Sequence, residues 1–249
     1  MPDKKRKYMS VPITPDQLPA NHLLSLLPPE EHQRIAPLLQ MVRTEFKQVL
    51  FEHDKVIEYV YFPCTSAFSV LTFLRNGTAI EVGTIGNEGF SGVNLLVGTE
   101  HATETTICQV AGDSLRMRAS DFRNEIATDT PLRRVGLKFL QAYLSQVSQS
   151  VACNRLHTIE ERFARWVLMT HDRVRTEQFH LTQEFLADML GVHRPSVSLV
   201  ASSFQQAGMI KYSRGNLTIL NRAGLEATSC ECYGMVKEQL QRILGLSRS

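Results

Sequence analysis

The sequence lacks apolar segments long enough to cross a membrane, and it lacks the cysteine density of a disulfide-stabilised protein. The stretch between Glu58 and Arg75 is free of formal charge, but Pro63 and several hydroxyl residues interrupt it, and a helix that spans a bilayer needs about 20 mostly apolar residues. Five scattered cysteines among 249 residues are typical of a protein in a reducing compartment. The basic residues at positions 4–7 precede prolines and not the apolar core of a secretory signal. We therefore expect a cytoplasmic protein without a membrane partner.

The sequence also lacks the local patterns of common catalytic and metal sites. Its eight histidines are dispersed, and it contains no Gly-x-Ser-x-Gly, Walker or His-Glu-x-x-His string. The only close pair of cysteines is Cys230 and Cys232, which would bind a metal with Cys153 and His157 only if all four met in space. Inert thiols are the simpler interpretation. We predict no enzymatic activity, no metal and no cofactor, and whether these cysteines are redox-active stays open.

Charge is unevenly distributed, although the chain as a whole carries a formal net charge of only +2. From residue 131 onward there are 15 Lys and Arg residues against 9 Asp and Glu residues, whereas the first 130 residues hold 12 and 16. Unless surface charges are simply scattered unevenly, this asymmetry predicts that only the C-terminal half meets a polyanion. With 43% hydrophobic residues, the chain has enough apolar side chains to fold around a core.

The N-terminal half is rich in short segments of β-branched and aromatic residues. Between residues 46 and 118 such segments alternate with turn residues, and the Asn76-Gly77 dipeptide favours a type I′ hairpin turn. This pattern predicts a compact β-barrel or sandwich. We place this domain at residues 21–130, after a flexible, proline-punctuated tail at residues 1–20.

A long helix is predicted over residues 131–157. Apolar residues recur along it every seven positions, which is the pattern of a two-helix coiled coil. The alternative is that this seam packs on the chain's own β domain, but the stripe is narrow and polar residues surround it, so we predict a homodimer. The predicted dimerisation residues are Leu137, Leu140, Leu144, Val147, Val151 and Asn154. Thr158 and Glu161 have the spacing of a capping box, which predicts a hinge and then a new helix.

Residues 181–210 have the pattern of a helix-turn-helix motif. Thr182 is a suitable N-cap for the first helix, Gly191 ends that helix, and a second helix begins at Arg194 and ends before Gly208. The stretch after this motif predicts two strands joined by a glycine-containing turn, which would form a wing.

A winged helix-turn-helix in the basic half of the chain predicts a domain that binds duplex DNA. We place this domain at residues 158–235, followed by a C-terminal tail at residues 236–249. The alternatives are two ordinary core helices joined by a turn, or a module that docks on another protein.

The second helix of the motif has a polar face opposite its apolar core positions. Such a helix presents its N-terminal residues to base edges in the major groove, and Arg194 is the one long donor there, suited to the O6 and N7 atoms of guanine. Thr182, His193, Ser196 and Arg214 are interpreted as phosphate or sugar contacts, which position the protein without specifying sequence. The predicted DNA contacts are Thr182, Gln183, His193, Arg194, Ser196, Ser198, Ser202 and Arg214. The alternative for each of them is an ordinary polar residue of the protein surface that does not contact DNA.

The order of these segments resembles the Crp/Fnr family, the bacterial regulators related to the cyclic AMP receptor protein and the anaerobic fumarate–nitrate regulator. The resemblance covers residues 23–225 and is most specific in residues 161–166, in the LTQEFLADMLGV string, and in residues 206–210. It implies an α+β fold with an N-terminal cyclic-nucleotide-binding-like β-roll, a long dimerisation helix and a C-terminal winged helix-turn-helix. It also implies a dimeric transcription factor that binds double-stranded DNA at a palindrome, often as an activator that contacts RNA polymerase.

The sequence departs from the family's pattern where a cyclic nucleotide would bind. Val93 stands in place of a family Glu, residues 101–105 replace an Arg-Ser pair, and no Lys or Arg lies between Asn76 and Leu115. Charge-assisted donors give a phosphate site much of its strength, so we expect a different, unidentified effector, although backbone N–H groups leave a non-standard phosphate site as an alternative. The candidate effector residues are Gly89, Ser91, Gly92, Thr103 and Thr105.

Two further departures concern the signal and the operator. Family members that carry an iron–sulfur cluster resemble one another in N-terminal cysteines, and here the first cysteine is Cys64. A thiol- or metal-sensing regulator stays a second alternative. Pro195 and Leu199 stand where both named regulators carry charged side chains, so the operator should differ from theirs.

Overall fold

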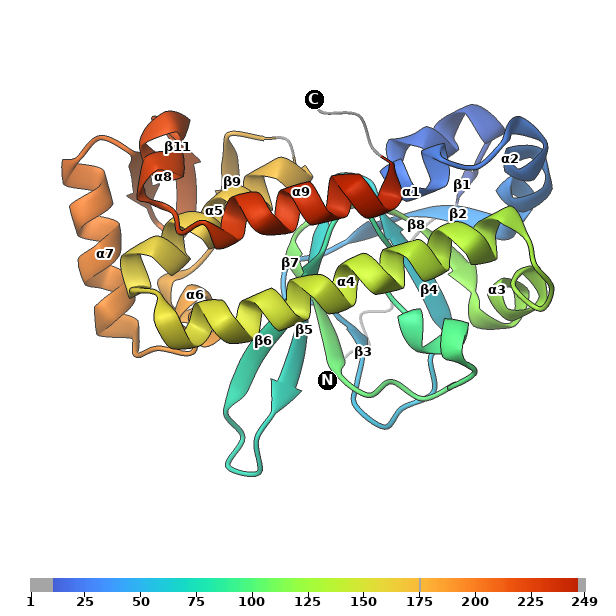
Figure 1. The fold of residues 1–249 in the computed structure, drawn as a ribbon, viewed down its shortest axis with the longest axis horizontal. Helices are drawn as coiled ribbons and strands as arrows, with labels where there is room; N and C mark the ends of the chain where they lie inside the picture. The colour runs from blue at the N-terminus through green and yellow to red at the C-terminus, as the bar shows by residue number, and fades with distance from the viewer. Residues whose placement is uncertain (1–10, 175, 246–249) are drawn as a thin grey trace, which may run out of the picture.

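The computed structural model describes residues 11–174 and 176–245, so the first ten and the last four residues of the two predicted tails lie outside the described part. Two β-sheets form the N-terminal part of the molecule, and a winged helix-turn-helix forms the C-terminal part. The long helix α4 (Pro131–Leu156) runs along both parts (Figure 1). This arrangement is the predicted α+β fold.

Eight antiparallel strands form the two sheets of the N-terminal part, in the orders β1-β2-β8-β4 and β3-β7-β5-β6. The strands are β1 (Val11–Pro12), β2 (Leu39–Thr44), β3 (Val49–Phe51), β4 (Tyr59–Pro63), β5 (Ala67–Phe73), β6 (Ala79–Ile85), β7 (Thr105–Val110) and β8 (Gly112–Arg118). Phe62 and Phe90, whose ring centroids lie 5.5 Å apart, are fully buried in the core together with Phe68 and Phe122. These strands, which are rich in β-branched and aromatic residues, confirm the predicted β-roll.

Short helices flank the strands and lead into α4. They are η1 (Pro15–Ala20), α1 (His22–Ser25), α2 (Pro29–Ile35), η2 (Ala36–Leu38), η3 (Val93–Val97) and α3 (Ala119–Glu125). Among the helices described here, none is both long enough and apolar enough to cross a bilayer.

The predicted flexible tail at residues 1–20 is wrong for its described part. Strand β1 pairs with β2, and η1 buries Leu18 completely. The prolines of this segment indicate a tail from sequence alone, but proline is also compatible with an edge strand and with the first turn of a helix. Here Pro12 lies in the edge strand β1 and Pro15 begins η1, whereas Pro19 lies inside η1.

The turn between β5 and β6 is not the predicted type I′ turn. Gly77 has a φ of 83°, Asn76 does not have a positive φ, and the Gly77 N–H donates to the Leu74 carbonyl at 2.9 Å. A type I′ turn needs positive φ at both central residues. The loop is instead one residue longer and ends in a left-handed glycine, the usual form of a three-residue hairpin connection.

Helix α4 packs one face against its own chain and leaves part of the predicted seam exposed. Its buried residues are Leu132, Gly136, Phe139, Ala142, Gln146 and Cys153. Leu137, Leu144 and Val151 are 41%, 57% and 69% exposed, and Leu140 and Val147 are half-buried. Leu140 packs against the N-terminal core, so the seam packs on the chain's own β domain in part, while Leu137, Leu144 and Val151 stay exposed.

The C-terminal part begins with α5 (Ile159–Val174), which starts at the predicted capping box. The Thr158 N–H donates to Glu161 Oε2 at 2.7 Å, and the Glu161 N–H donates to Thr158 Oγ1 at 3.3 Å. The elements that follow are β9 (Gln178–His180), α6 (Gln183–Leu190), α7 (Arg194–Gln206), β10 (Ile210–Ser213), β11 (Asn216–Ile219) and α8 (Arg222–Thr228). They form the predicted winged helix-turn-helix, with β9 as a third strand beside the wing.

The predicted C-terminal tail at residues 236–249 is wrong where the structure describes it. Helix α9 (Cys232–Leu244) lies along α4 (Figure 1). Val236 and Leu244 are buried, and Leu240 packs against the N-terminal core. These residues recur every four positions, which is the spacing of one helix face, so the sequence does contain the signal for this helix.

Buried polar contacts join the two parts of the molecule. The Arg173 guanidinium of α5 donates to Glu88 Oε1 at 2.8 Å, and both side chains are less than a tenth exposed. The Trp166 indole donates to Glu81 Oε1 at 2.9 Å. Two elements that are distant in sequence, β6 with its following loop and α5, are therefore held together by charge-assisted hydrogen bonds.

Candidate nucleic-acid interface

The two helices of the motif cross over a shared apolar core. Leu186, Val197 and Val200 are at most 3% exposed, and Ala187 supplies a small side chain between the helices. The ring of Phe204 packs edge-on against Phe163 of α5, with centroids 5.2 Å apart. The core fixes the angle at which α7 crosses α6, and Arg194, Leu199 and Ser202 lie exposed on the other face of α7.

The turn between α6 and α7 follows from its glycine. Gly191 has a φ of 61°, in the left-handed region that a residue after a helix commonly adopts. The Val192 N–H donates to the Ala187 carbonyl at 3.0 Å, and the Arg162 guanidinium bonds to the Leu190 carbonyl. The last carbonyls of α6 are thus satisfied, and α7 can start at once with Arg194.

The exposed face of α7 contains the predicted reading residue. Arg194 is the first residue of the helix and is exposed, as are His193 before it and Ser202 two turns later. Ser196 is half-buried. The Ser198 hydroxyl is already engaged, because it lies 2.7 Å from Gln183 Oε1 and 3.2 Å from the Arg194 carbonyl. Leu199 is 73% exposed and gives this face one apolar side chain.

The wing turn holds Arg214 in a defined place. Arg214 and Gly215 have φ angles of 51° and 76°, and Ser213 pairs with Asn216 across the hairpin. This is the two-residue turn with positive φ at both positions that the sequence pattern predicted for residues 75–78. It projects Arg214 at the tip of the hairpin, where the side chain is exposed.

A surface groove of about 430 Å³ brings four of the predicted contacts together. Its walls are the start of α6, the start of α7 and the wing, and its lining residues are Thr182, Gln183, Arg194, Tyr212, Arg214 and Gly215. His193, Ser196, Ser198 and Ser202 do not line it. The groove places two guanidinium groups, from two different elements, around one concave surface.

Tyr212 lines this groove and was not among the predicted contacts. Its hydroxyl bonds to the Leu181 carbonyl, and its backbone N–H donates to Gln205 Oε1 at 2.9 Å. Burial raises the pKa of Tyr212 to about 12, so the phenol stays neutral near pH 7. The side chain therefore anchors the wing strand to the start of α6. The only sequence signal for Tyr212 is the alternation of apolar and polar residues in the wing strand.

The predicted effector residues have packing and hydrogen-bond partners within the chain. Gly89 lies against the Phe139 ring, where a Cβ would come within 2.1 Å of ring carbons. The Ser91 hydroxyl bonds to the Tyr61 carbonyl, and Gly92 is buried beside Val60. The segment that the sequence assigned to an effector thus packs against α4 and β4.

Two threonines complete the predicted effector set, and both have other partners. Thr103 accepts a hydrogen bond from Asn94 at 2.7 Å and donates to Glu104 at 2.6 Å. Thr105 accepts from the His53 backbone N–H at 3.2 Å. The effector role of Gly89, Ser91, Gly92, Thr103 and Thr105 stays a prediction.

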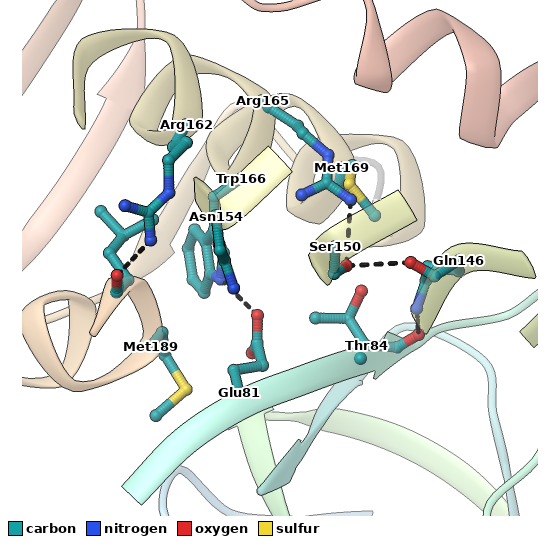
Figure 2. Close-up of a pocket in the computed structure, with 12 residues that line it drawn as sticks. Glu81, Thr84, Gln146, Ser150, Asn154, Arg162, Arg165, Trp166, Met169 and Met189 are labelled. Carbon is teal, nitrogen blue, oxygen red and sulfur yellow. Dashed lines mark hydrogen bonds between the residues drawn. The ribbon is translucent and has the colours of Figure 1, made fainter. Parts of the chain in front are cut away.

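A small polar cavity lies where β6, α4, α5 and α6 meet (Figure 2). Its volume of about 30 Å³ is room for one or two water molecules and not for an organic effector. Figure 2 shows Glu81, Gln146 and Arg165 pointing into it from three different elements. Burial raises the pKa of Glu81 to about 7, although Trp166, Arg173 and Arg165 act in the opposite direction.

Comparison with known proteins agrees with this architecture. Residues 161–228 match the family model of the Crp-like helix-turn-helix domain. No curated protein sequence matches the chain. Many solved structures share its fold.

Three of these structures illustrate the likeness. FixK2 from Bradyrhizobium japonicum is 16% identical, with 77% of this chain and 98% of that chain covered and a TM-score of 0.64. TTHB099, a CRP-family transcriptional regulator from Thermus thermophilus, is 17% identical, with coverages of 83% and 98% and a TM-score of 0.60. TTHA1359, a CRP/FNR-family regulator from the same organism, is 16% identical, with coverages of 76% and 97% and a TM-score of 0.61. At these identities the similarity shows a shared fold.

Proposed function

We propose that this chain, which carries a Crp-like helix-turn-helix domain on the fold of the Crp/Fnr regulators, is a dimeric transcription regulator that binds a palindromic DNA operator. The single observation that supports this most directly is the groove at the start of α7, where Arg194 and Arg214 line one concave surface. One groove then offers both a group that can contact the DNA backbone and a group that can read a base edge, as sequence-specific binding requires.

In this proposal α7 enters the major groove and the wing lies along the phosphates. Arg194 presents two parallel donors to a guanine edge, which is the commonest specific contact in such interfaces. Arg214, Thr182 and the other polar residues of the interface contact phosphates or sugars. Leu199, exposed on the same helix, offers an apolar contact suited to a thymine methyl group.

The dimer would form through the exposed seam of α4. A groove of about 380 Å³ runs beside this seam, between β6 and α4, and Val82, Val147 and Val151 are among its lining residues. A second α4 packed against the seam would cover the exposed Leu144 and Val151, which otherwise leave apolar surface in water. Asn154 at the same seam would fix the register of the two helices at some cost in stability.

The proposal includes RNA polymerase as a partner and activation as the outcome of binding. Both rest on the likeness in fold to Crp/Fnr regulators and on the family resemblance of the sequence. The chain is then a regulator and not an enzyme. Transcription from a promoter that carries the operator, measured with purified polymerase with and without this protein, tests the sign of regulation.

A salt titration tests the DNA-binding function against the alternative of a protein-docking module. Binding to duplex DNA releases counterions from phosphates, so the logarithm of the affinity should fall linearly as the logarithm of the salt concentration rises. Fluorescence anisotropy with a labelled duplex measures this slope. Binding that does not change with salt, or the absence of duplex binding in low salt, would contradict the proposal.

A further inference from the structure

The strongest unassigned feature of the molecule is a cluster of three cysteines and one histidine at the hinge. Cys153 lies in the last turn of α4, His157 follows α4 directly, and Cys230 and Cys232 lie where α8 passes into α9. One ligand atom from each side chain lies within 4.8 Å of all the others. The sequence separates these residues by up to 79 positions, and the fold brings them together.

We propose that Cys153, His157, Cys230 and Cys232 bind one Zn²⁺ ion. Zinc in structural sites is tetrahedral, with Zn–S distances of about 2.3 Å and Zn–N distances of about 2.0 Å. The edges of that tetrahedron are about 3.8 Å between two sulfurs and about 3.5 Å between sulfur and nitrogen. In the structure Cys153 Sγ lies 3.6 Å from Cys230 Sγ, and Cys232 Sγ lies 3.6 Å from His157 Nδ1.

The groups around the cluster are those that support a metal site. A histidine that ligates a metal usually bonds through its other ring nitrogen to a carboxylate, and His157 Nε2 lies 3.2 Å from Glu231 Oε2. The Gln149 amide donates to Cys232 Sγ at 3.0 Å.

The geometry favours a single zinc ion over an iron–sulfur cluster or a disulfide. Four ligand atoms within 4.8 Å surround one ion, whereas an iron–sulfur cluster distributes its ligands over several irons. A disulfide between Cys153 and Cys230 would use two of the four side chains and give no role to the contact of His157 with Glu231. A ligand set of three sulfurs and one nitrogen is a known structural zinc set.

The burial of the cysteines and the partial exposure of His157 fit a structural zinc ion. The three cysteines are at most 4% exposed and form a small core of their own, while His157 is half-buried at the edge and leaves a path for the ion. Binding would release the thiol protons, because zinc takes cysteine as the thiolate. The ion would then join the end of α4, the hinge and the start of α9 into one unit.

A zinc ion that joins these elements would also affect DNA binding. This second inference rests on the proposed function. Helix α4 carries the dimer seam, and α5, which starts two residues after His157, leads into the helix-turn-helix. Zinc at the hinge would fix the angle between these helices, and therefore the spacing of the two α7 helices in a dimer. Zinc loading should raise operator affinity.

Metal analysis of the full-length protein tests the site without reference to DNA. Protein purified under reducing conditions and loaded with Zn²⁺ should retain about one zinc ion per chain after gel filtration, as four protein ligands predict. Co²⁺ in its place should give the strong visible absorption of a tetrahedral thiolate site. Protein that retains no zinc after loading, or that contains a Cys153–Cys230 disulfide under these conditions, would overturn the proposal.

Substitutions distinguish the zinc ligands from the other cysteines of the chain. Cys230→Ser and His157→Ala should abolish zinc retention, and Glu231→Gln, which alters an exposed carboxylate, should weaken zinc affinity about 10–100-fold. Cys64→Ser and Cys108→Ser are matched controls, because both cysteines are buried but lie outside the cluster, and they should keep full zinc. Equal zinc content in the control and cluster variants would also overturn the site. Zinc binding without any effect on operator affinity would overturn only the hinge step.

Discussion

In the proposed interface, Arg194 and Arg214 have different roles because of their positions. Arg194 opens α7, where a guanidinium can reach a base edge, and Arg214 occupies the tip of a hairpin, where phosphates are the nearest partners. Arg194→Ala should lower the affinity for the best operator by about 1–3 kcal/mol and relax preference at one base pair per half-site. Anisotropy titrations with the operator and with single-base variants measure both effects.

The matched variant at the wing should behave differently. Arg214→Ala should weaken binding to all duplexes alike and lower the salt slope by about one unit for each phosphate that the side chain no longer neutralises. If Arg194→Ala keeps the wild-type base preferences and loses only overall affinity, α7 is not the reading helix.

Glu81 makes stability depend on pH in an unusual direction. Burial raises the pKa of this carboxyl to about 7, so between about pH 4.5 and pH 7 the folded protein keeps a proton that the unfolded chain releases. Its contribution to stability is complete below about pH 4.5 and is lost as the pH rises through 7, by about 3 kcal/mol in all. Glu81→Gln keeps an acceptor for Trp166 and removes the titration.

Urea unfolding at pH 5 and pH 8 measures this effect. The difference in free energy of unfolding between Glu81→Gln and wild type should move in favour of the variant by about 3 kcal/mol between the two pH values. A difference that stays constant would mean that Glu81 is charged in the folded protein throughout this range.

At the scale of elements, the helices of the motif were predictable because their signals are local. The N-cap Thr182, the left-handed Gly191 and the capping box of Thr158 act within a few residues, and the structure contains all three. Strand β1 was missed because tertiary contacts decide it, and α9 was missed although Val236, Leu240 and Leu244 have the spacing of one helix face. Strand β1 exists only through pairing with β2, and α9 is stabilised by burial against α4, in line with the general weight of packing over propensity.

Helix α4 should hold the dimer together. Leu144→Asp with Val147→Asp would place like charges opposite each other across the two-fold axis, where burying them is costly. Sedimentation should then report monomers, and operator binding should be lost. Val49→Asp is the control, because Val49 is 49% exposed and lies in β3, at the sheet edge opposite β6, beside which the seam lies. A double variant that remains dimeric would show that the seam does not form the interface.

The contact between α5 and the loop after β6 should contribute strongly to stability. Arg173→Met leaves Glu88 buried without its charged partner, which should lower the free energy of unfolding by about 3–5 kcal/mol. Arg134→Met is the control, since the Arg134–Asp129 pair is exposed and such pairs contribute at most about 1 kcal/mol. Urea denaturation measures both. Adding Glu88→Gln to Arg173→Met should recover part of the stability, and no recovery would contradict the buried-charge explanation.

At the scale of the whole molecule, the sequence predicted the order of the parts but not what the fold brings together. The basic half, the seam and the wing could each be recognised along the chain. The meeting of Cys153 with Cys230, and of Arg173 with Glu88, depends on the path of α9 along α4 and of α5 along β6. Spacing in the sequence carries no information about these contacts. For the same reason the sequence did not indicate that Gly89 lies against Phe139 or that Ser91 bonds to Tyr61.

The measurement that tests sequence-specific DNA binding by a dimer most directly is a binding selection from random DNA duplexes with the wild-type protein. If α7 reads DNA in a two-fold dimer, the enriched sequences should be inverted repeats with half-site centres about 10–11 base pairs apart, because two-fold related helices enter successive major grooves on one face. Each half-site should contain a guanine that Arg194 contacts. Enrichment of a single, non-repeated site, or no enriched sequence at all, would contradict this function.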